Sequence, residues 1–191
     1  MSNSLVNTRD QQFLLFEQLG IEKLFESELY KDFSKDDVLM MMNEAEKMAL
    51  NVILPTYEVG DKEGCTFKGG KVSVPKCYHD AFKKYCEAGW LAQVQPPDVG
   101  GQGLPFTMMT ANLEPCYAAN FAFLMYPGLT HGAAGLILHH GTEELKNKYM
   151  YKMFAGEWGG TMCLTEPGAG SDVGALRTTA KRLPDGKFLI T

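Results

Sequence analysis

The run M-C-L-T-E-P-G-A-G-S-D-V-G, from Met162 to Gly174, sets an apolar segment directly before a polar turn. The change falls at Pro167: the residues ahead of it suit a buried strand, and Gly168 and Gly170 behind it allow backbone angles that other residues rarely adopt. Successive backbone N–H groups in such a turn bind phosphate oxygens, and the Ser171 hydroxyl can donate to the same oxygens. The turn therefore predicts a phosphate-bearing ligand.

Two better-known phosphate loops do not fit this turn. Gly168, Gly170 and Gly174 follow the spacing G-x-G-x-x-x-G, which is too long for the dinucleotide-binding fingerprint. The run Gly69-Gly70-Lys71 lacks the leading glycine and the following hydroxyl residue of a P-loop. Taken alone, Thr165 to Asp172 also fits a surface turn whose side chains only cap local backbone groups.

Further motifs lie upstream of the turn and decide between these readings. In chain order the set reads P-P-D-V-G-G-Q-G-L at Pro96–Leu104, G-T-E-E-L-K-N-K-Y at Gly141–Tyr149, G-E-W-G-G-T at Gly156–Thr161 and L-T-E-P-G-A-G-S-D at Leu164–Asp172. The order and spacing resemble those of the flavin-dependent acyl-CoA dehydrogenases. The stretches from about Tyr30 to Asn51 and from Cys65 to Trp90 are similar to the longer branch that includes 3-methylthiopropanoyl-CoA dehydrogenases.

The resemblance implies an FAD cofactor and an acyl-CoA substrate. It places the segment from Met162 to Thr165 against the flavin ring system, and it assigns Ser171 to the flavin pyrophosphate or to the bound acyl-CoA. The Thr165 hydroxyl suits the pyrimidine edge of the ring, where it can meet carbonyl and imide groups. The candidate cofactor-binding residues are Met162, Cys163, Leu164, Thr165, Gly170 and Ser171.

The implied reaction removes two hydrogens across the Cα–Cβ bond of an acyl thioester. In the family the base is a glutamate outside these 191 residues, so no catalytic residue is assigned and the chain alone is expected to be inactive. Further flavin-contacting strands and a C-terminal helical domain are expected beyond Thr191. The family also implies an electron-transferring flavoprotein as partner and a homo-oligomer. Alternatives are a flavin oxidase of the same superfamily, and a truncated helical module for assembly or acyl-CoA binding without catalysis.

Several polar residues are assigned no chemistry. Because carboxylates repel phosphates, Glu166 and Asp172 are expected to face away from the ligand, paired with Arg177 or Lys181. The histidines lack the spacing of a metal site and are expected at core or helix-end positions. They are His131, His139 and His140.

Composition narrows the class of protein. A net charge of −5 argues against nucleic-acid binding, which needs clustered lysine and arginine. Five cysteines without C-x-x-C spacing suit reduced thiols and no metal site. The N-terminal residues 1–12 resemble neither a signal peptide nor a transit peptide, which predicts a cytoplasmic protein.

The segment from Pro115 to Thr142 contains no charged residue and raises the question of a membrane span. Prolines, glycines and histidines interrupt it, and broken helices leave backbone groups unpaired in lipid. We therefore expect a buried helical pair in a soluble core and no membrane span. Within it, Met125 to His131 fits either a lining of the acyl pocket or an ordinary turn between helices.

The predicted fold is mainly α: a helical domain over residues 1–158, followed over 159–191 by the first strands of a flavin-binding β domain that is incomplete here. A capping box at Ser34 begins a helix that Pro55 ends, and further helices begin at Pro75 and Thr142. Short strands are expected at Thr161–Leu164, Thr178–Lys181 and Phe188–Ile190, the last two joined by a turn at Pro184-Asp185-Gly186.

Overall fold

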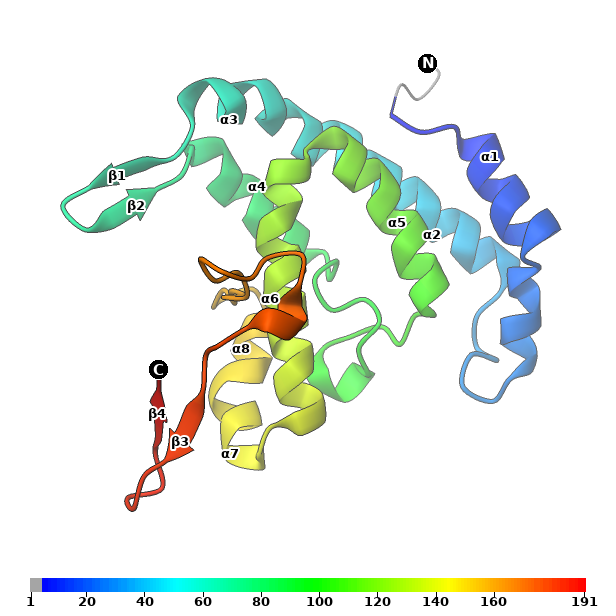
Figure 1. The fold of residues 1–191 in the computed structure, drawn as a ribbon. Helices are drawn as coiled ribbons and strands as arrows, with labels where there is room; N and C mark the ends of the chain where they lie inside the picture. The colour runs from blue at the N-terminus through cyan, green and yellow to red at the C-terminus, as the bar shows by residue number, and fades with distance from the viewer. Residues whose placement is uncertain (1–4) are drawn as a thin grey trace. The chain divides into compact units, whose positions relative to one another are not determined.

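The computed structural model describes residues 5–191, which form two compact units (Figure 1). The larger unit ends at Gly160 and is helical apart from one hairpin, and the smaller unit is Thr161–Thr191. The mainly α fold is therefore confirmed. Residues 1–4, on which the expected absence of a targeting signal partly rests, lie outside the described residues, so that expectation stays a prediction.

The regular elements are as follows. The α-helices are α1 (Thr8–Gln12), α2 (Lys35–Met48), α3 (Tyr57–Glu63), α4 (Lys76–Glu87), α5 (Phe106–Ala119), α6 (Phe121–His140), α7 (Glu143–Leu145) and α8 (Tyr151–Phe154). Wider π-helical turns are Phe13–Gln18, Ala49–Ile53 and Lys146–Met150, and tighter 3-10 turns are Ile21–Glu26, Leu54–Thr56, Pro97–Val99 and Val173–Ala175. The strands are β1 (Thr66–Lys68), β2 (Lys71–Ser73), β3 (Ala180–Arg182) and β4 (Phe188–Ile190).

The start of α2 was predicted correctly, and its end was not. The Ser34 hydroxyl accepts the Asp37 N–H at 3.3 Å and the Asp37 carboxylate accepts the Ser34 N–H at 2.8 Å, which is the predicted capping box. The Ser34 hydroxyl also donates to the Asp37 carboxylate at 2.5 Å, and this bond, followed by the bond from the Ser34 N–H, holds the pKa of Asp37 below its usual value. Pro55 does not end the helical path, because a π-helical turn and a 3-10 turn carry the chain through it into α3. Those turns change the backbone hydrogen-bond pattern around a residue that has no N–H to donate.

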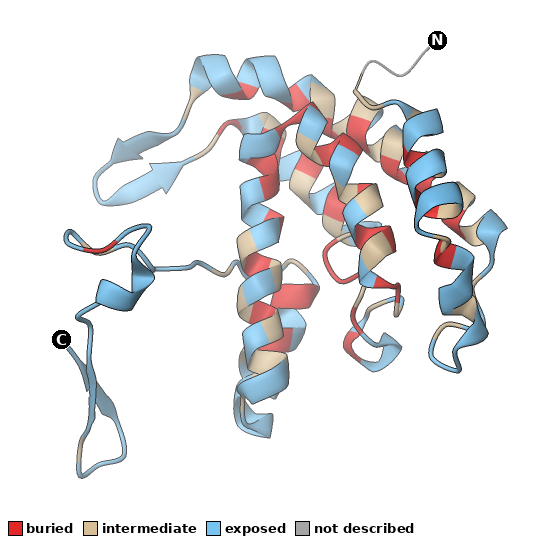
Figure 2. Ribbon diagram, turned by 45° about the vertical axis from the view of Figure 1, so that its right-hand side comes forward, coloured by how far each residue is buried: buried red, intermediate tan, exposed pale blue. Residues whose placement is uncertain are grey.

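The larger unit also contains a hairpin that the helical prediction missed. Strands β1 and β2 pair antiparallel, with Phe67 opposite Val72. Gly69 and Gly70 join them with φ values of 58° and 77°, and two consecutive positive φ angles are what a tight two-residue hairpin turn requires. The hairpin is exposed along its whole length (Figure 2).

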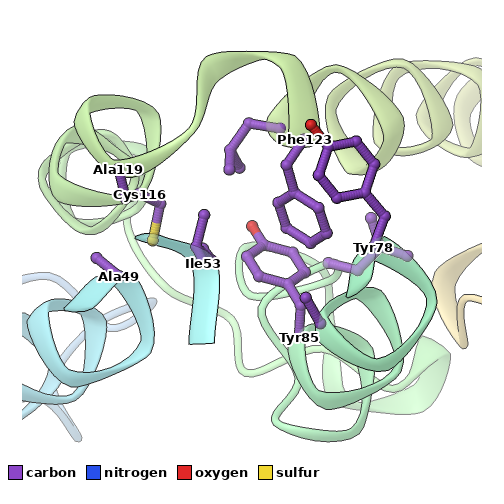
Figure 3. Packing of buried hydrophobic residues seen from close by; sticks show 10 residues of the cluster. Ala49, Ile53, Tyr78, Tyr85, Cys116, Ala119 and Phe123 are labelled. Atoms are coloured by element: carbon purple, nitrogen blue, oxygen red, sulfur yellow. The ribbon is translucent and has the colours of Figure 1, made fainter. Parts of the chain in front are cut away.

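The core of the larger unit is built around aromatic side chains from α4 and α6. The Phe123 ring meets the Tyr78 ring at 5.9 Å and the Tyr85 ring at 6.1 Å between centroids, both edge to face (Figure 3). The helix predicted to begin at Pro75 therefore forms as α4, and it presents apolar residues to the core. Gly89 follows this helix with a φ of 79°, which glycine adopts without steric cost.

A buried asparagine connects this core to neighbouring segments. Asn120, 1% exposed, caps α6 by accepting the Phe123 N–H at 3.1 Å. Its amide group donates to the Thr56 hydroxyl at 2.9 Å and to the Tyr78 hydroxyl at 3.4 Å. The Thr56 hydroxyl in turn donates to the Ile53 carbonyl at 2.6 Å. The start of α6 is thus tied to α4 and to the segment that follows α2.

Helix α6 differs from the prediction in two ways. It runs unbroken through Pro127 and Gly128, so the alternative that Met125 to His131 forms a turn between helices is wrong. It packs against α5 and α8 but leaves Phe121 and Leu136 exposed, so it is less buried than expected. Of the helices in residues 5–191, α6 is long and apolar enough to cross a membrane by length and composition. The expected absence of a membrane span stays a prediction.

The smaller unit contains one hairpin and long connecting loops. Strands β3 and β4 pair antiparallel with Lys181 opposite Leu189, and Gly186 closes their turn with a φ of 83°, as the sequence predicts. The strand expected at Thr161–Leu164 does not form. A strand needs a partner for its backbone groups, and within residues 161–191 no second strand lies beside this run.

The network around Asn120 predicts that its loss costs more than the loss of an ordinary helix cap. Asn120→Ala leaves the Phe123 N–H buried without its acceptor. We therefore expect the free energy of unfolding to fall by about 2 to 4 kcal/mol. The matched control is the exposed cap of α7, where the Thr142 hydroxyl accepts the Leu145 N–H at 3.4 Å. Thr142→Ala should cost about 0.5 to 1 kcal/mol. Urea unfolding followed by circular dichroism measures the free energy of unfolding of both variants. Equal losses would show that the hydrogen bonds around Asn120 contribute no more than an ordinary helix cap.

Candidate functional site

The predicted ligand turn is closed by its own backbone. The Glu166 N–H donates to the Ala169 carbonyl at 2.9 Å, and the Ala169 N–H donates back to the Glu166 carbonyl at 3.1 Å. Ala169 is the one buried residue within 161–191. The turn at Pro167-Gly168 therefore has a defined shape, although very little apolar surface is buried beneath it.

The turn presents donors that no group of the described residues accepts. Within residues 5–191, the backbone N–H groups of Gly168, Gly170 and Ser171 have no acceptor, and the exposed Ser171 hydroxyl has no partner. Gly168 and Gly170 do not adopt left-handed φ angles, so the expected reason for these glycines is wrong. A Cβ at Gly168 would meet no atom within 4 Å. What the glycines provide is open space around backbone donors, which suits the approach of an anion.

The apolar run before the turn is exposed, and not buried as expected. The side chains of Met162 and Leu164 are 64% and 41% exposed, and Cys163 and Thr165 are exposed beside them. Contiguous exposed apolar side chains in a soluble protein mark a contact surface. An apolar run next to free phosphate-type donors fits a ligand that has a flat ring system and a pyrophosphate.

The Glu166 carboxylate turns to the segment ahead of β3. One oxygen accepts the Arg177 N–H at 2.8 Å, and the other accepts the Thr178 N–H at 2.9 Å and the Thr178 hydroxyl. The expected ion pair with the Arg177 side chain is therefore replaced by bonds to backbone. The Thr178 hydroxyl bond and then the two N–H bonds hold the pKa of Glu166 below its usual value.

The remaining titratable groups of the described chain show no catalytic arrangement. The His131 ring lies 3.0 Å from the Leu91 carbonyl and is half-buried in the helical core, as expected. Burial raises the pKa of the Cys116 thiol to about 12, and burial followed by the Glu87 charge raises that of Cys86 to about 11, so both thiols are inert. Residues 5–191 contain no cluster of metal-ligating side chains.

The helical unit holds several cavities. One of about 480 Å³ lies between α4 and α6 and is lined by aromatic residues such as Phe82 and Tyr126. Another of about 160 Å³ is lined by Pro127, Gly128 and His131 among others. Both of these cavities are lined in part by the Met125 to His131 segment, whose role in lining an acyl pocket stays a prediction. The contribution of α4 to the larger of these two was not predicted.

Comparison with known proteins settles the family. The sequence model described as Acyl-CoA dehydrogenase, N-terminal domain, matches residues 35–157. The chain belongs to the acyl-CoA dehydrogenase family. It is 38% identical over 180 residues to a butyryl-CoA dehydrogenase of Syntrophomonas wolfei, a match covering 92% of this chain and 29% of the relative. It is 34% identical over 162 residues to the 3-methylmercaptopropionyl-CoA dehydrogenase of Ruegeria pomeroyi, covering 85% and 28%.

Structural comparison agrees with the sequence matches. An acyl-CoA dehydrogenase from Bacillus anthracis, solved in complex with FAD, superimposes with a TM-score of 0.66 at 27% identity. The match covers 84% of this chain and 26% of that structure. The chain thus spans less than a third of the length of these relatives. Its helical unit and its candidate turn are the parts available for assigning function.

Proposed function

We propose that this chain contributes the helical N-terminal domain and the first flavin-binding loop of an FAD-dependent acyl-CoA dehydrogenase. The observation that carries the proposal is the loop itself, in which the exposed run from Met162 to Thr165 leads through the Glu166–Ala169 turn to the unused donors of Gly170 and Ser171. The family membership of the chain and the FAD complex of a relative support the assignment. When bound, FAD supplies the acceptor for the hydride that leaves the acyl Cβ.

Each residue of the loop has a role in this proposal. Met162, Cys163 and Leu164 cover one side of the flavin ring, and the Thr165 hydroxyl bonds to its pyrimidine edge. The N–H groups of Gly170 and Ser171 hold pyrophosphate oxygens, and the Ser171 hydroxyl donates to the pyrophosphate or to the acyl-CoA. These groups bind and orient, and none of them moves a proton.

In this proposal the catalytic base lies outside residues 5–191. The proposed substrate is an acyl-CoA thioester, whose α proton passes to a carboxylate from another part of the protein. An electron-transferring flavoprotein as electron acceptor, a homo-oligomeric assembly and a cytoplasmic location belong to the same proposal. The rival function, a helical module that assembles or binds acyl-CoA without flavin, makes the opposite prediction for FAD binding.

Ligand protection of a cysteine tests the function directly. Cys163 and Cys65 are both exposed, but only Cys163 lies in the proposed flavin loop. In the protein expressed from its complete natural reading frame, FAD at about nine times its dissociation constant leaves about a tenth of the sites free, so alkylation of Cys163 should slow about tenfold. Alkylation of Cys65, followed in the same sample by mass spectrometry, should not change. Equal rates at Cys163 with and without bound FAD would remove this loop from the flavin site.

The second prediction concerns the serine hydroxyl. Ser171→Ala removes one charge-assisted hydrogen bond of roughly 1.5 to 3 kcal/mol, so affinity for FAD or for an acyl-CoA should fall by about ten- to a hundredfold. Stability should barely change, because the exposed side chain leaves no cavity. Ser73→Ala, in the exposed strand β2, is the control and should leave affinity unchanged. A loss of thermal stability at Ser171→Ala with both affinities intact would identify the hydroxyl as a local cap.

A further inference from the structure

Glu166 links two segments that together define the shape of the candidate loop. Its backbone pairs with Ala169 across the turn, and its side chain reaches Arg177 and Thr178 on the far side of the 3-10 turn Val173–Ala175. The loop that carries Gly170 and Ser171 lies between these two points of attachment. Glu166 therefore makes hydrogen bonds at both ends of that loop.

The chemistry of the contact is specific to an ionised glutamate. Both carboxylate oxygens are engaged, one by the Arg177 N–H at 2.8 Å and the other by the Thr178 N–H at 2.9 Å together with the Thr178 hydroxyl. Only a carboxylate accepts on both oxygens, since an amide side chain has one oxygen and an NH₂ group that donates. Bonds of this charge-assisted kind are stronger than neutral ones.

Little else holds this part of the smaller unit in place. Nearly all of its residues are exposed, and Ala169 alone is buried. Segments with few buried contacts open locally at low cost, so their shape depends on the polar bonds that remain. Those bonds also explain how a carboxylate is tolerated beside a phosphate-type turn, because both of its oxygens are occupied by donors from Arg177 and Thr178.

We propose that Glu166 is a positioning residue for cofactor binding: it holds Gly170 and Ser171 in the geometry that receives the flavin phosphates, without touching cofactor or substrate. The inference rests on the proposed function of the loop. It differs from a purely structural role, which would lower the stability of the unit and leave the affinity of the folded protein for FAD unchanged.

The test is Glu166→Gln in the protein expressed from its complete natural reading frame. Glutamine keeps the size of the side chain and places an NH₂ group against one of the two backbone donors. Asp185→Asn is the matched control, because it removes the same charge from the same unit, where the Asp185 carboxylate accepts the Lys187 N–H at 3.2 Å in the β3–β4 turn. Two quantities are measured: amide hydrogen exchange at Arg177 and Thr178, and the dissociation constant for FAD by flavin fluorescence.

We expect Glu166→Gln to speed exchange at both amides and to weaken FAD binding by about tenfold, with Asp185→Asn changing neither. Thr178→Val, which removes only the hydroxyl donor, should give a smaller loss of FAD affinity and serves if the first variant does not fold. If amide exchange becomes faster while FAD affinity is unchanged, Glu166 is not a positioning residue. If amide exchange is unchanged, the hydrogen bonds of Glu166 do not hold Arg177 and Thr178 in place. Wild-type protein that binds no FAD would refute both the proposed function and this role in cofactor binding, while the exchange rates still show whether those hydrogen bonds hold the two residues.

Discussion

The edge-to-face contact of Phe123 with Tyr78 and Tyr85 is the interaction on which the helical unit depends. It joins α4 to α6 at the point where Asn120 ties both to the segment after α2. The contact imposes its own demand on sequence, because a Cβ at Gly60 would lie 2.2 Å from the Tyr78 hydroxyl. Only glycine leaves room for the tyrosine at its present depth. Aromatic burial and a small polar network thus fix the start of the longest helix.

The smaller unit is held in shape mainly by hydrogen bonds and much less by apolar burial. It buries little apolar surface, and its loop is shaped by hydrogen bonds that one carboxylate accepts and by one backbone pair. This division suits the proposed function. A loop that must leave backbone donors free for phosphate oxygens cannot cover them with its own core, so polar ties such as that of Glu166 are the remaining way to give it a shape.

Local signals were predictable from the sequence where a short pattern has one physical outcome. The capping box at Ser34 and the turn ending in Gly186 are of this kind. The prediction that Pro55 ends a helix was wrong, because π-helical and 3-10 turns carry the helical path through the proline. The hairpin at Gly69-Gly70 was not predicted, although a glycine pair is typical of a tight turn. The strand at Thr161–Leu164 failed because pairing depends on a partner and not on propensity. For the candidate site, the motif nominates the residues and their role stays a prediction, but no sequence pattern reveals that Glu166 bonds to backbone.

In the proposed function, the turn after Pro167 binds the phosphates of FAD through its backbone. The most direct measurement is an FAD titration of protein labelled with ¹⁵N at glycine, followed by the amide signals. We expect the signals of Gly168 and Gly170 to move to saturation with the bound flavin, while those of Gly100 and Gly103, in the loop before α5, stay in place. Bound flavin with unmoved Gly168 and Gly170 signals would contradict it.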